Sequence, residues 1–138
     1  MLKHVARPLG WLFEKLEANR PFGESDAWNL FRWSALAEAC GWTLLIAGIL
    51  TQHFHWPGAS GAVLVTGQVH GTIFMIYFAV VLVTYGSLRW SRKKLVAALL
   101  CGVPPYGTLA FELWANHKRR NHLARIRYRN SFLVLLGA

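Results

Sequence analysis

Charged residues are absent from a long stretch in the middle of the chain. Residues 39–88 contain no Asp, Glu, Lys or Arg over 50 positions, whereas about 20 apolar residues are enough to cross a bilayer core as one helix. Within this stretch, residues 51–60 read TQHFHWPGAS, and Pro57 and Gly58 do not readily continue a lipid-exposed helix. The pattern therefore predicts two membrane-spanning helices, near residues 27–50 and 62–88, joined by a short aqueous loop.

A third apolar segment follows at residues 95–114, with Pro104 and Pro105 at its middle and Glu112 near its end. Two prolines remove two backbone donors and bend a helix, so this segment either spans the membrane with a kink or turns back as a re-entrant hairpin. We predict the kinked span, because each half is short and Trp114 is typical of an interface anchor. The expected fold class is an all-α membrane protein with three transmembrane helices, the third kinked at Pro104-Pro105, and an N-terminal amphipathic interfacial helix.

The two ends of the chain differ from this apolar centre. Residues 1–24 place apolar side chains at helical spacing with charges between them, which predicts an amphipathic helix. This helix either lies in the membrane interface or docks on the rest of the protein. Its charges also argue against a signal peptide, so we expect the N-terminus to be retained. Residues 25–117 form the predicted transmembrane domain, and residues 118–138 form a basic tail.

The basic residues indicate the orientation of the helices. The net charge is +9, and none of the 15 Lys and Arg residues lies in the loop at residues 51–60. Because cytoplasmic loops are rich in Lys and Arg, we expect that loop outside and the N-terminus inside, in the cytoplasmic membrane of a bacterium. A kinked third span would put the basic tail outside, whereas a re-entrant hairpin would keep it in the cytoplasm. Insertion in both orientations is a third possibility.

Basic residues that flank apolar helices are expected to contact anionic lipid headgroups rather than nucleic acid. The predicted headgroup contacts are Arg89, Arg92, Lys93, Lys94, Lys118, Arg119 and Arg120. The basic tail either grips a phospholipid or an acidic partner, or it acts only as a topology signal.

Polar side chains within the predicted spans are few. Glu38 on the first span and His70 on the second fall at depths that differ by about one helical turn, so we expect them to meet. Glu38 is then either protonated or paired with His70 or Arg32, since an unpaired polar group in hydrocarbon is costly. The predicted intramembrane polar site consists of Arg32, Glu38, His70, Tyr77 and Glu112. It is either a clasp that fixes helix packing or a pocket that handles protons or a ligand.

Small residues predict where the spans approach each other. Each span carries a pair of small residues four positions apart, a spacing that allows close packing of membrane helices. The predicted packing positions are Ala37, Gly41, Gly67, Gly71, Pro104 and Pro105.

No catalytic or cofactor motif accompanies these residues. Hydrolase, metalloprotease, P-loop and dinucleotide-binding patterns do not occur in the sequence. His53 and His55 form an H-x-H pair without a third ligand nearby, and His70 alone does not complete bis-histidine haem ligation within one chain. Cys40 and Cys101 are interpreted as small buried hydrophobic residues. We therefore expect no enzymatic activity, no metal and no cofactor.

Three segments resemble one known family. They read FRWSALAEACGWTLLIAG (residues 31–48), GQVHGTIFMIYFAVVLVTYGSLRW (67–90) and GVPPYGTLAFE (102–112). In this order they resemble the YdzA-like family of small bacterial integral membrane proteins, a domain of unknown function. The family pattern falls on Arg32, Glu38, His70, Gly71, Tyr77, Pro105 and Glu112. The resemblance implies three helices in a bacterial cytoplasmic membrane and implies no reaction.

Two functions follow from these observations. The first is a non-catalytic accessory or assembly subunit, or a self-associating subunit, with Glu38 and His70 as a buried polar clasp. The second is a minimal oligomeric proton-coupled transporter or channel that uses Glu38, His70 and Glu112. It would need two or more copies, because three helices enclose almost no aqueous space. The expected partners are a bilayer with anionic headgroups and either further copies of the chain or a larger membrane complex.

Overall fold

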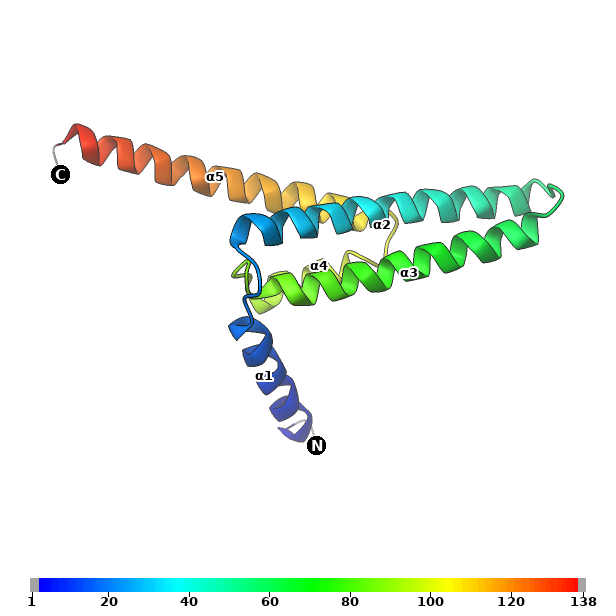
Figure 1. Ribbon diagram of the computed structural model, residues 1–138, viewed down its shortest axis with the longest axis horizontal. Helices are drawn as coiled ribbons and strands as arrows, with labels where there is room; N and C mark the ends of the chain where they lie inside the picture. Colours follow the sequence, from blue (N-terminus) through cyan, green and yellow to red (C-terminus); the bar gives the residue numbers. More distant parts are fainter. Residues whose placement is uncertain (1–2, 137–138) are drawn as a thin grey trace.

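The computed structural model describes the backbone of residues 3–136 and the side chains of residues 9–136. That part of the chain contains five helices and no strand (Figure 1). The helices are α1 (Lys3–Ala18), α2 (Glu24–His53), α3 (Ala59–Tyr85), α4 (Arg92–Leu100) and α5 (Gly107–Leu135). The outermost positions of the predicted N-terminal helix and basic tail, residues 1–2 and 137–138, lie outside the described residues.

Helices α2 and α3 form a long antiparallel hairpin. They contain 30 and 27 residues, so they extend ~45 and ~40 Å at ~1.5 Å per residue, more than the ~30 Å of a hydrocarbon core. Both are long and apolar enough to cross a membrane. The chain reverses between them at residues 54–58, where His55 and Gly58 have φ of 52° and 79°. This is the position at which the sequence predicts a break between two spans.

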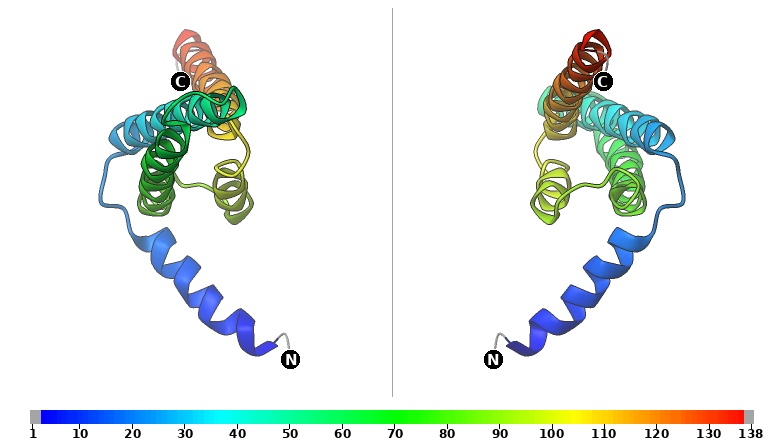
Figure 2. Two further views of the ribbon diagram at one scale, coloured as in Figure 1. Left: turned by 90° about the vertical axis from the view of Figure 1, so that its right-hand side faces the viewer. Right: turned by 90° about the vertical axis from the view of Figure 1, so that its left-hand side faces the viewer.

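The third apolar segment does not form a span. The prediction of a third, kinked transmembrane helix is wrong, because only α2 and α3 among the described residues are long and apolar enough to cross. The segment divides into the nine-residue α4, which runs along α3, and α5, which returns along α2 (Figures 1 and 2). Pro104 and Pro105 cannot continue the hydrogen-bonding of a helix, and Tyr106 has a φ of 59°. The prolines therefore mark a chain reversal.

The turn between α4 and α5 reaches the central part of α2. The hydroxyl of Tyr106 lies 3.0 Å from Oγ1 of Thr43. Three N–H groups of residues 102–107 donate to nearby carbonyls at 3.1 Å each, and the prolines have no N–H group to satisfy. Gly102 is buried so closely that a Cβ there would lie 3.1 Å from Phe74 and 3.2 Å from Tyr77. The turn is therefore compact and largely satisfies its own backbone.

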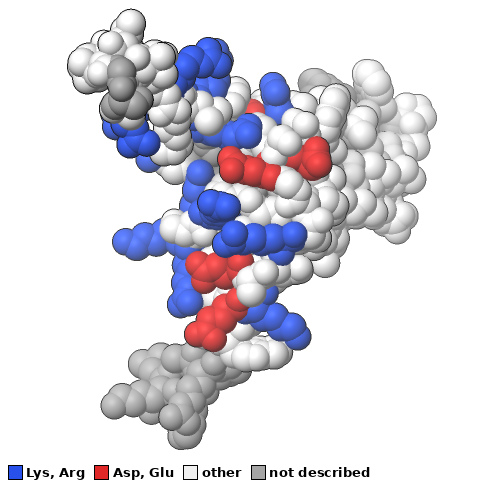
Figure 3. Space-filling view, turned by 60° about the vertical axis from the view of Figure 1, so that its left-hand side comes forward, with Lys and Arg blue, Asp and Glu red and all other residues white. Residues whose placement is uncertain are grey.

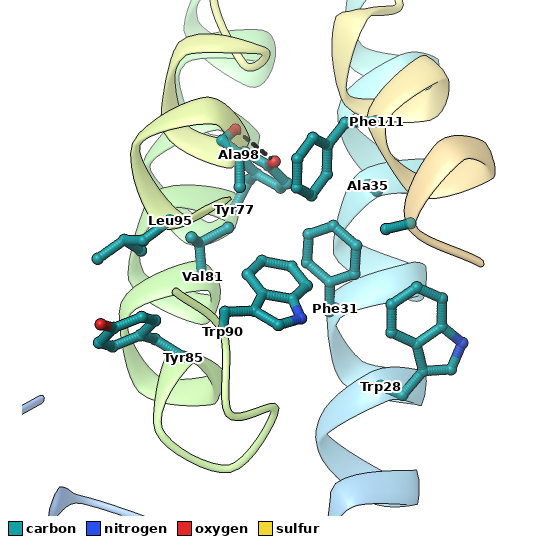
Figure 4. Close-up of a cluster of buried hydrophobic side chains, with 11 residues drawn as sticks. Trp28, Phe31, Ala35, Tyr77, Val81, Tyr85, Trp90, Leu95, Ala98 and Phe111 are labelled. Atoms are coloured by element: carbon teal, nitrogen blue, oxygen red, sulfur yellow. Dashed lines mark hydrogen bonds between the residues drawn. The ribbon is translucent and has the colours of Figure 1, made fainter. Parts of the chain in front are cut away.

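Helices α2 to α5 enclose an aromatic core at one end of the long hairpin (Figure 4). Phe31 lies fully buried within it. Its ring centroid is 4.9 Å from that of Trp90 and 6.0 Å from that of Phe111, both edge to face, and 5.6 Å from that of Trp28. Such tilted geometries are favoured by the charge distribution of aromatic rings. Beyond the α4–α5 turn, only α2 and α3 continue side by side (Figure 1).

The α4–α5 hairpin brings the basic segments of the chain to one end of the molecule. Residues 89–94 lie at the end of α3, and residues 118–129 leave the bundle on the same side, near the start of α2 (Figure 1). Figure 3 shows Lys and Arg side chains gathered at this end. The opposite end, residues 54–58, carries no Lys or Arg. The spatial separation of charge is therefore stronger than the order of the sequence suggests.

Helix α1 contacts the bundle through its C-terminal end and points away from the bundle axis (Figure 2). Gly86 packs on this end so closely that a Cβ there would meet the carbonyl oxygen of Leu16. The N–H of Phe22 donates to Oγ of Ser87 at 3.4 Å. Trp11 of the same helix is 61% exposed. Phe13 and Leu16 pack against the aromatic core, so part of the apolar side of α1 faces the protein. The location of this helix in the membrane interface stays a prediction.

We predict that both ends of the chain lie on the same side of the membrane. In a Cys40→Ala, Cys101→Ala background, Ser25→Cys and Asn130→Cys should react with a membrane-impermeant maleimide from one side, and His55→Cys from the other. The reason is that the α4–α5 hairpin turns back before it crosses the membrane, so α5 ends on the side on which α4 begins. Labelling of Asn130→Cys from the same side as His55→Cys would contradict the hairpin.

Candidate functional site

One face of α2 carries small residues at every seventh position. Ala27, Ser34, Gly41 and Gly48 are all buried. Seven residues are close to two helical turns, so these positions line up along one side of the helix, and small side chains there allow a neighbouring helix to approach. The hydroxyl of Ser34 is satisfied by the carbonyl of Phe31 at 2.7 Å. This face sets the position of the polar residues beside it.

Glu38 and His70 meet at the contact between α2 and α3. Nδ1 of His70 lies 3.8 Å from Oε1 of Glu38; the Glu38 side chain is fully buried and that of His70 is 13% exposed. The imidazole also lies against Trp42, with ring centroids 4.5 Å apart. A Cβ at Gly41 would come within 3.1 Å of Nδ1 of His70. The absence of a side chain at Gly41 therefore makes room for the imidazole.

The Glu38–His70 pair is close but is not hydrogen-bonded. Its separation exceeds the ~3.2 Å limit of a good N–H···O bond. Both oxygens of Glu38 and Nδ1 of His70 are buried without a hydrogen-bond partner in the described part of the chain. A polar group that is buried without a polar neighbour in hydrocarbon is costly, so each side chain is better placed beside the other than alone. The geometry therefore favours the pair and leaves Glu38 with unused hydrogen-bonding capacity.

Arg32 and Glu112 form a second polar contact, between α2 and α5. Nε of Arg32 lies 3.3 Å from Oε1 of Glu112; the Glu112 side chain is 3% exposed and that of Arg32 is 53% exposed. Arg32 precedes Glu38 by six positions, so the two lie on different sides of α2. Of the two partners considered for Glu38, the structure brings His70 to it, and Arg32 pairs with Glu112 instead.

Two hydroxyl groups attach the α4–α5 hairpin to the long helices. The hydroxyl of Tyr77 donates to the carbonyl of Ala98 in α4 at 2.8 Å (Figure 4). The hydroxyl of Thr108 in α5 donates to the carbonyl of Ala35 at 3.2 Å. Tyr77 is thus engaged with α4. The predicted polar residues divide into the three contacts Glu38–His70, Arg32–Glu112 and Tyr77–Ala98.

The predicted packing positions on the long helices have different surroundings. Gly41 lies in the α2–α3 contact, and a Cβ at Gly67 would lie 3.9 Å from Leu45, which is an ordinary contact. Ala37 is exposed, and a Cβ at Gly71 would meet nothing within 4 Å. Ala37 and Gly71 therefore do not bring α2 and α3 together within one chain.

Among the glycines of α2 and α3, the closest approach to the other helix is at Gly48, a position that the four-residue spacing does not identify. A Cβ at Gly48 would collide with Oγ1 of Thr66. The hydroxyl of Thr66 is satisfied by the carbonyl of Ala62 at 2.8 Å, so it lies close to its own helix. The sequence signal for this contact is the seven-residue spacing of small residues along α2.

The predicted headgroup residues cluster at the basic end of the bundle, and several lie on aromatic rings. The cation-to-ring distances are 5.3 Å for Arg92 over Phe13, 5.0 Å for Lys94 over Trp90, 4.4 Å for Lys118 over Trp114 and 5.2 Å for Arg119 over Trp28. Burial and the charge of Lys118 lower the pKa of Lys94. Arg89, Lys93 and Arg120 are exposed.

Residues 28–117 match a family described as a domain of unknown function, DUF3817. The chain belongs to this family. The matched DUF3817 segment extends from α2 into the first part of α5 and contains Glu38, His70, Arg32, Glu112 and Tyr77.

Two relatives of this chain are membrane proteins by name. SCO5905 of Streptomyces coelicolor, named as a candidate membrane protein, is 34% identical over 99 residues, which is 71% of this chain. The uncharacterized membrane protein YdzA of Bacillus subtilis is 29% identical over 58 residues, which is 42% of this chain. The resemblance to the YdzA-like family is thereby confirmed, and neither name states a reaction. The aligned segments span 12% of SCO5905 and 60% of YdzA. No solved structure matches the chain.

We predict that Gly48→Ala destabilises the protein by ~1–3 kcal/mol, because its Cβ would collide with Thr66 and the α2–α3 contact would have to open. Gly67→Ala is the matched control. It should be neutral or stabilising by up to ~1 kcal/mol, because Ala favours a helix more than Gly does. Unfolding of the purified protein in detergent, followed by circular dichroism, measures both. Equal effects of the two substitutions would contradict the assigned contact.

Proposed function

We propose that the chain is a non-catalytic, self-associating subunit of the bacterial cytoplasmic membrane. In this proposal α2 and α3 span the bilayer, both ends of the chain face the cytoplasm, and α4 and α5 form a hairpin that enters from the cytoplasmic side. Support for this orientation comes from the basic segments, which lie at one end of the bundle and favour the cytoplasmic side.

Within this proposal, Glu38 and His70 form a clasp that fastens α2 to α3. Support comes from Tyr77 and Glu112, whose side chains are already engaged with other groups. A proton path from this pair would need further titratable groups, but the Tyr77 hydroxyl bonds to a carbonyl and Glu112 lies beside Arg32. The pair is therefore more consistent with helix packing than with a continuous relay.

The observation that carries self-association is an uncovered polar face on α3. Gln68, Gly71 and Thr72 are exposed. Helical geometry puts Gln68 and Thr72 on the side of α3 opposite to the one that carries His70, with Gly71 at the edge of that side. Gln68 is the tenth residue of α3, so it lies well inside the proposed span. The Thr72 hydroxyl is satisfied by the carbonyl of Gln68 at 2.9 Å. An amide side chain at that depth requires a hydrogen-bond partner, which another helix can supply.

A second copy of the chain is the occupant that fits this face. An amide carries both donors and an acceptor, so two Gln68 side chains can bond reciprocally across a two-fold axis. Gly71 presents no side chain beside it, and the space around its Cβ position is open. Two α3 helices could therefore approach closely and cover each other's polar face.

We predict that Gln68→Leu and Gly71→Leu each weaken self-association. Loss of ~0.6–2 kcal/mol of interhelical contact would raise the dissociation constant of the dimer roughly threefold to thirtyfold. Energy transfer between labelled copies, titrated against lipid in phosphatidylcholine–phosphatidylglycerol vesicles, measures this constant. Ala47→Leu, at an exposed position of α2, is the matched control and should leave the constant unchanged.

Two outcomes would contradict this proposal. A wild-type chain that stays monomeric at every ratio of protein to lipid would refute self-association and favour the accessory role, in which a different membrane protein covers the face. A pair of α3 variants that dimerise as well as Ala47→Leu does would refute the α3 face as the interface between copies. The accessory role is supported by the match to 12% of a much longer Streptomyces coelicolor protein, where a related segment adjoins a larger body.

One feature favours the second function, a proton-coupled transporter or channel built from two or more copies. Glu38 is fully buried in a proposed span, and neither of its oxygens has a hydrogen-bond partner in the described part of the chain. A carboxyl in that state can bind and release a proton if a path reaches it. Glu38 and His70 would carry the proton in such an assembly, with Glu112 further along the path.

We predict that wild-type protein in liposomes does not dissipate an imposed pH gradient. We also predict that Glu38→Gln and His70→Ala both lower its thermal stability, by ~1–3 kcal/mol each, because each disrupts the buried contact between the two side chains. An entrapped pH-sensitive dye reads the gradient. Empty liposomes and Ala47→Leu protein are the controls. Dissipation by wild type that both variants abolish would support the transporter and refute the clasp.

A further inference from the structure

A cavity of about 240 Å³ opens at the basic end of the bundle, between the start of α2, the α3–α4 turn and the middle of α5. Trp28 and Trp90 form its apolar wall. The charged and titratable residues that line it are Arg89, Lys94, Lys118, Arg119, His122 and Glu24. Figure 3 shows the Lys and Arg side chains that crowd this end of the molecule. The cavity is thus a basic recess with aromatic walls.

The positive charge of this cavity is only partly compensated. Oε1 of Glu24 lies 3.7 Å from Nε of Arg119, so this carboxylate offsets one cation. Among the residues whose side chains are described, Arg89, Lys94 and Lys118 have no carboxylate within ion-pair distance. Three cations without a protein counter-charge therefore face the same small volume.

Lys94 and Lys118 are held close together. The ammonium groups of both lie over the ring of Trp114, at 5.8 and 4.4 Å from its centroid. Burial, and after it the like charge of Lys118, lower the pKa of Lys94. An anion between the two would remove this repulsion and add charge-assisted hydrogen bonds.

The backbone at the cavity adds to this preference for an anion. Helix α4 begins here, and Oγ of its N-cap Ser91 accepts the N–H of Lys94 at 3.3 Å. The N-terminus of a helix carries partial positive charge. Arg89 has a φ of 50°, a conformation that residues other than Gly rarely adopt. The sharp turn at Arg89 therefore connects α3 to α4 with a basic residue at the edge of the cavity.

We propose that this cavity binds the phosphate group of an anionic ligand, with Lys94 and Lys118 as its main charge partners. The cavity is smaller than the ~300–1,000 Å³ typical of sites for drug-sized molecules, which suits a phosphate or phosphodiester group. This group could come from the headgroup of an anionic phospholipid or from free phosphate. Indole rings and basic side chains at the same level of a membrane protein are typical of the lipid interface.

The full chain in neutral detergent tests this proposal by native mass spectrometry and a titration of tryptophan fluorescence. The probes are phosphatidylglycerol, phosphatidylcholine with the same acyl chains, and inorganic phosphate at constant ionic strength. Phosphatidylglycerol should bind roughly tenfold more tightly than phosphatidylcholine. The variant Lys94→Gln/Lys118→Gln should lose roughly tenfold in affinity for the anionic probe, and Lys94→Arg/Lys118→Arg should recover most of it.

Lys93→Gln/Arg120→Gln is the matched control, because it removes the same charge from exposed positions outside the lining of the cavity. It should change the affinity by less than about twofold, since these two charges do not line the cavity and act on its contents only from a distance, through solvent. Equal weakening in both glutamine variants would overturn the site and indicate diffuse attraction to the surface. Wild-type protein that prefers neither phosphatidylglycerol nor phosphate over phosphatidylcholine would also overturn it. Binding of inorganic phosphate alone, lost only in the Lys94/Lys118 variant, would support the site with free phosphate as its source.

Discussion

A chain that reverses direction inside a bilayer must satisfy its own backbone, because hydrocarbon offers no hydrogen bonds. In the proposed orientation the α4–α5 turn largely meets this requirement: the N–H groups of residues 101, 102, 103 and 107 donate to nearby carbonyls, and Pro104 and Pro105 bring none that need a partner. This reversal puts α5 beside α2, so Glu112 reaches Arg32 and Thr108 reaches the carbonyl of Ala35. The same reversal returns the basic second half of α5 to the end where α2 begins. The polar contacts and the separation of charge both depend on it.

The two halves of the bundle are held together by different means. At the basic end, four helices surround an aromatic core in which Phe31 contacts rings from several segments. Beyond the turn only α2 and α3 remain, so apolar side chains there face the proposed lipid environment and gain little by burial. In that half, small residues allow close approach, as at Gly48 and Thr66. The Glu38–His70 pair lies between these two regions, and in the proposed clasp this contact would specify the register of α2 against α3.

The sequence predicts much of this arrangement but not the chain reversal between α4 and α5. The absence of charge over residues 39–88 and the Pro57-Gly58 break are enough to place the α2–α3 hairpin, and the similar depths of Glu38 and His70 are enough to predict their contact. The path of residues 95–114 is different, because a double proline permits both a kink and a reversal. Which of these occurs depends on contacts such as Tyr106 with Thr43 and Gly102 with Phe74. These contacts join residues more than 25 positions apart, so no local pattern reveals them. The role of Gly48, by contrast, follows a seven-residue spacing that is readable in the sequence.

The proposed dimer face and the proposed phosphate cavity lie far apart along α3. Gln68 and Gly71 are in its first half, whereas the cavity begins at Leu88 and Arg89, beyond its last residue. Some 20 residues of helix, or ~30 Å, separate them. Free energies of distant sites that share no partner are usually additive, so loss of charge at Lys94 and Lys118 should leave the dimer constant unchanged. Coupling between the two would require a change in α3 itself, and the hydrogen bond from Tyr77 to the carbonyl of Ala98, which joins α3 to α4 between the two sites, is one of the contacts that resist such a change.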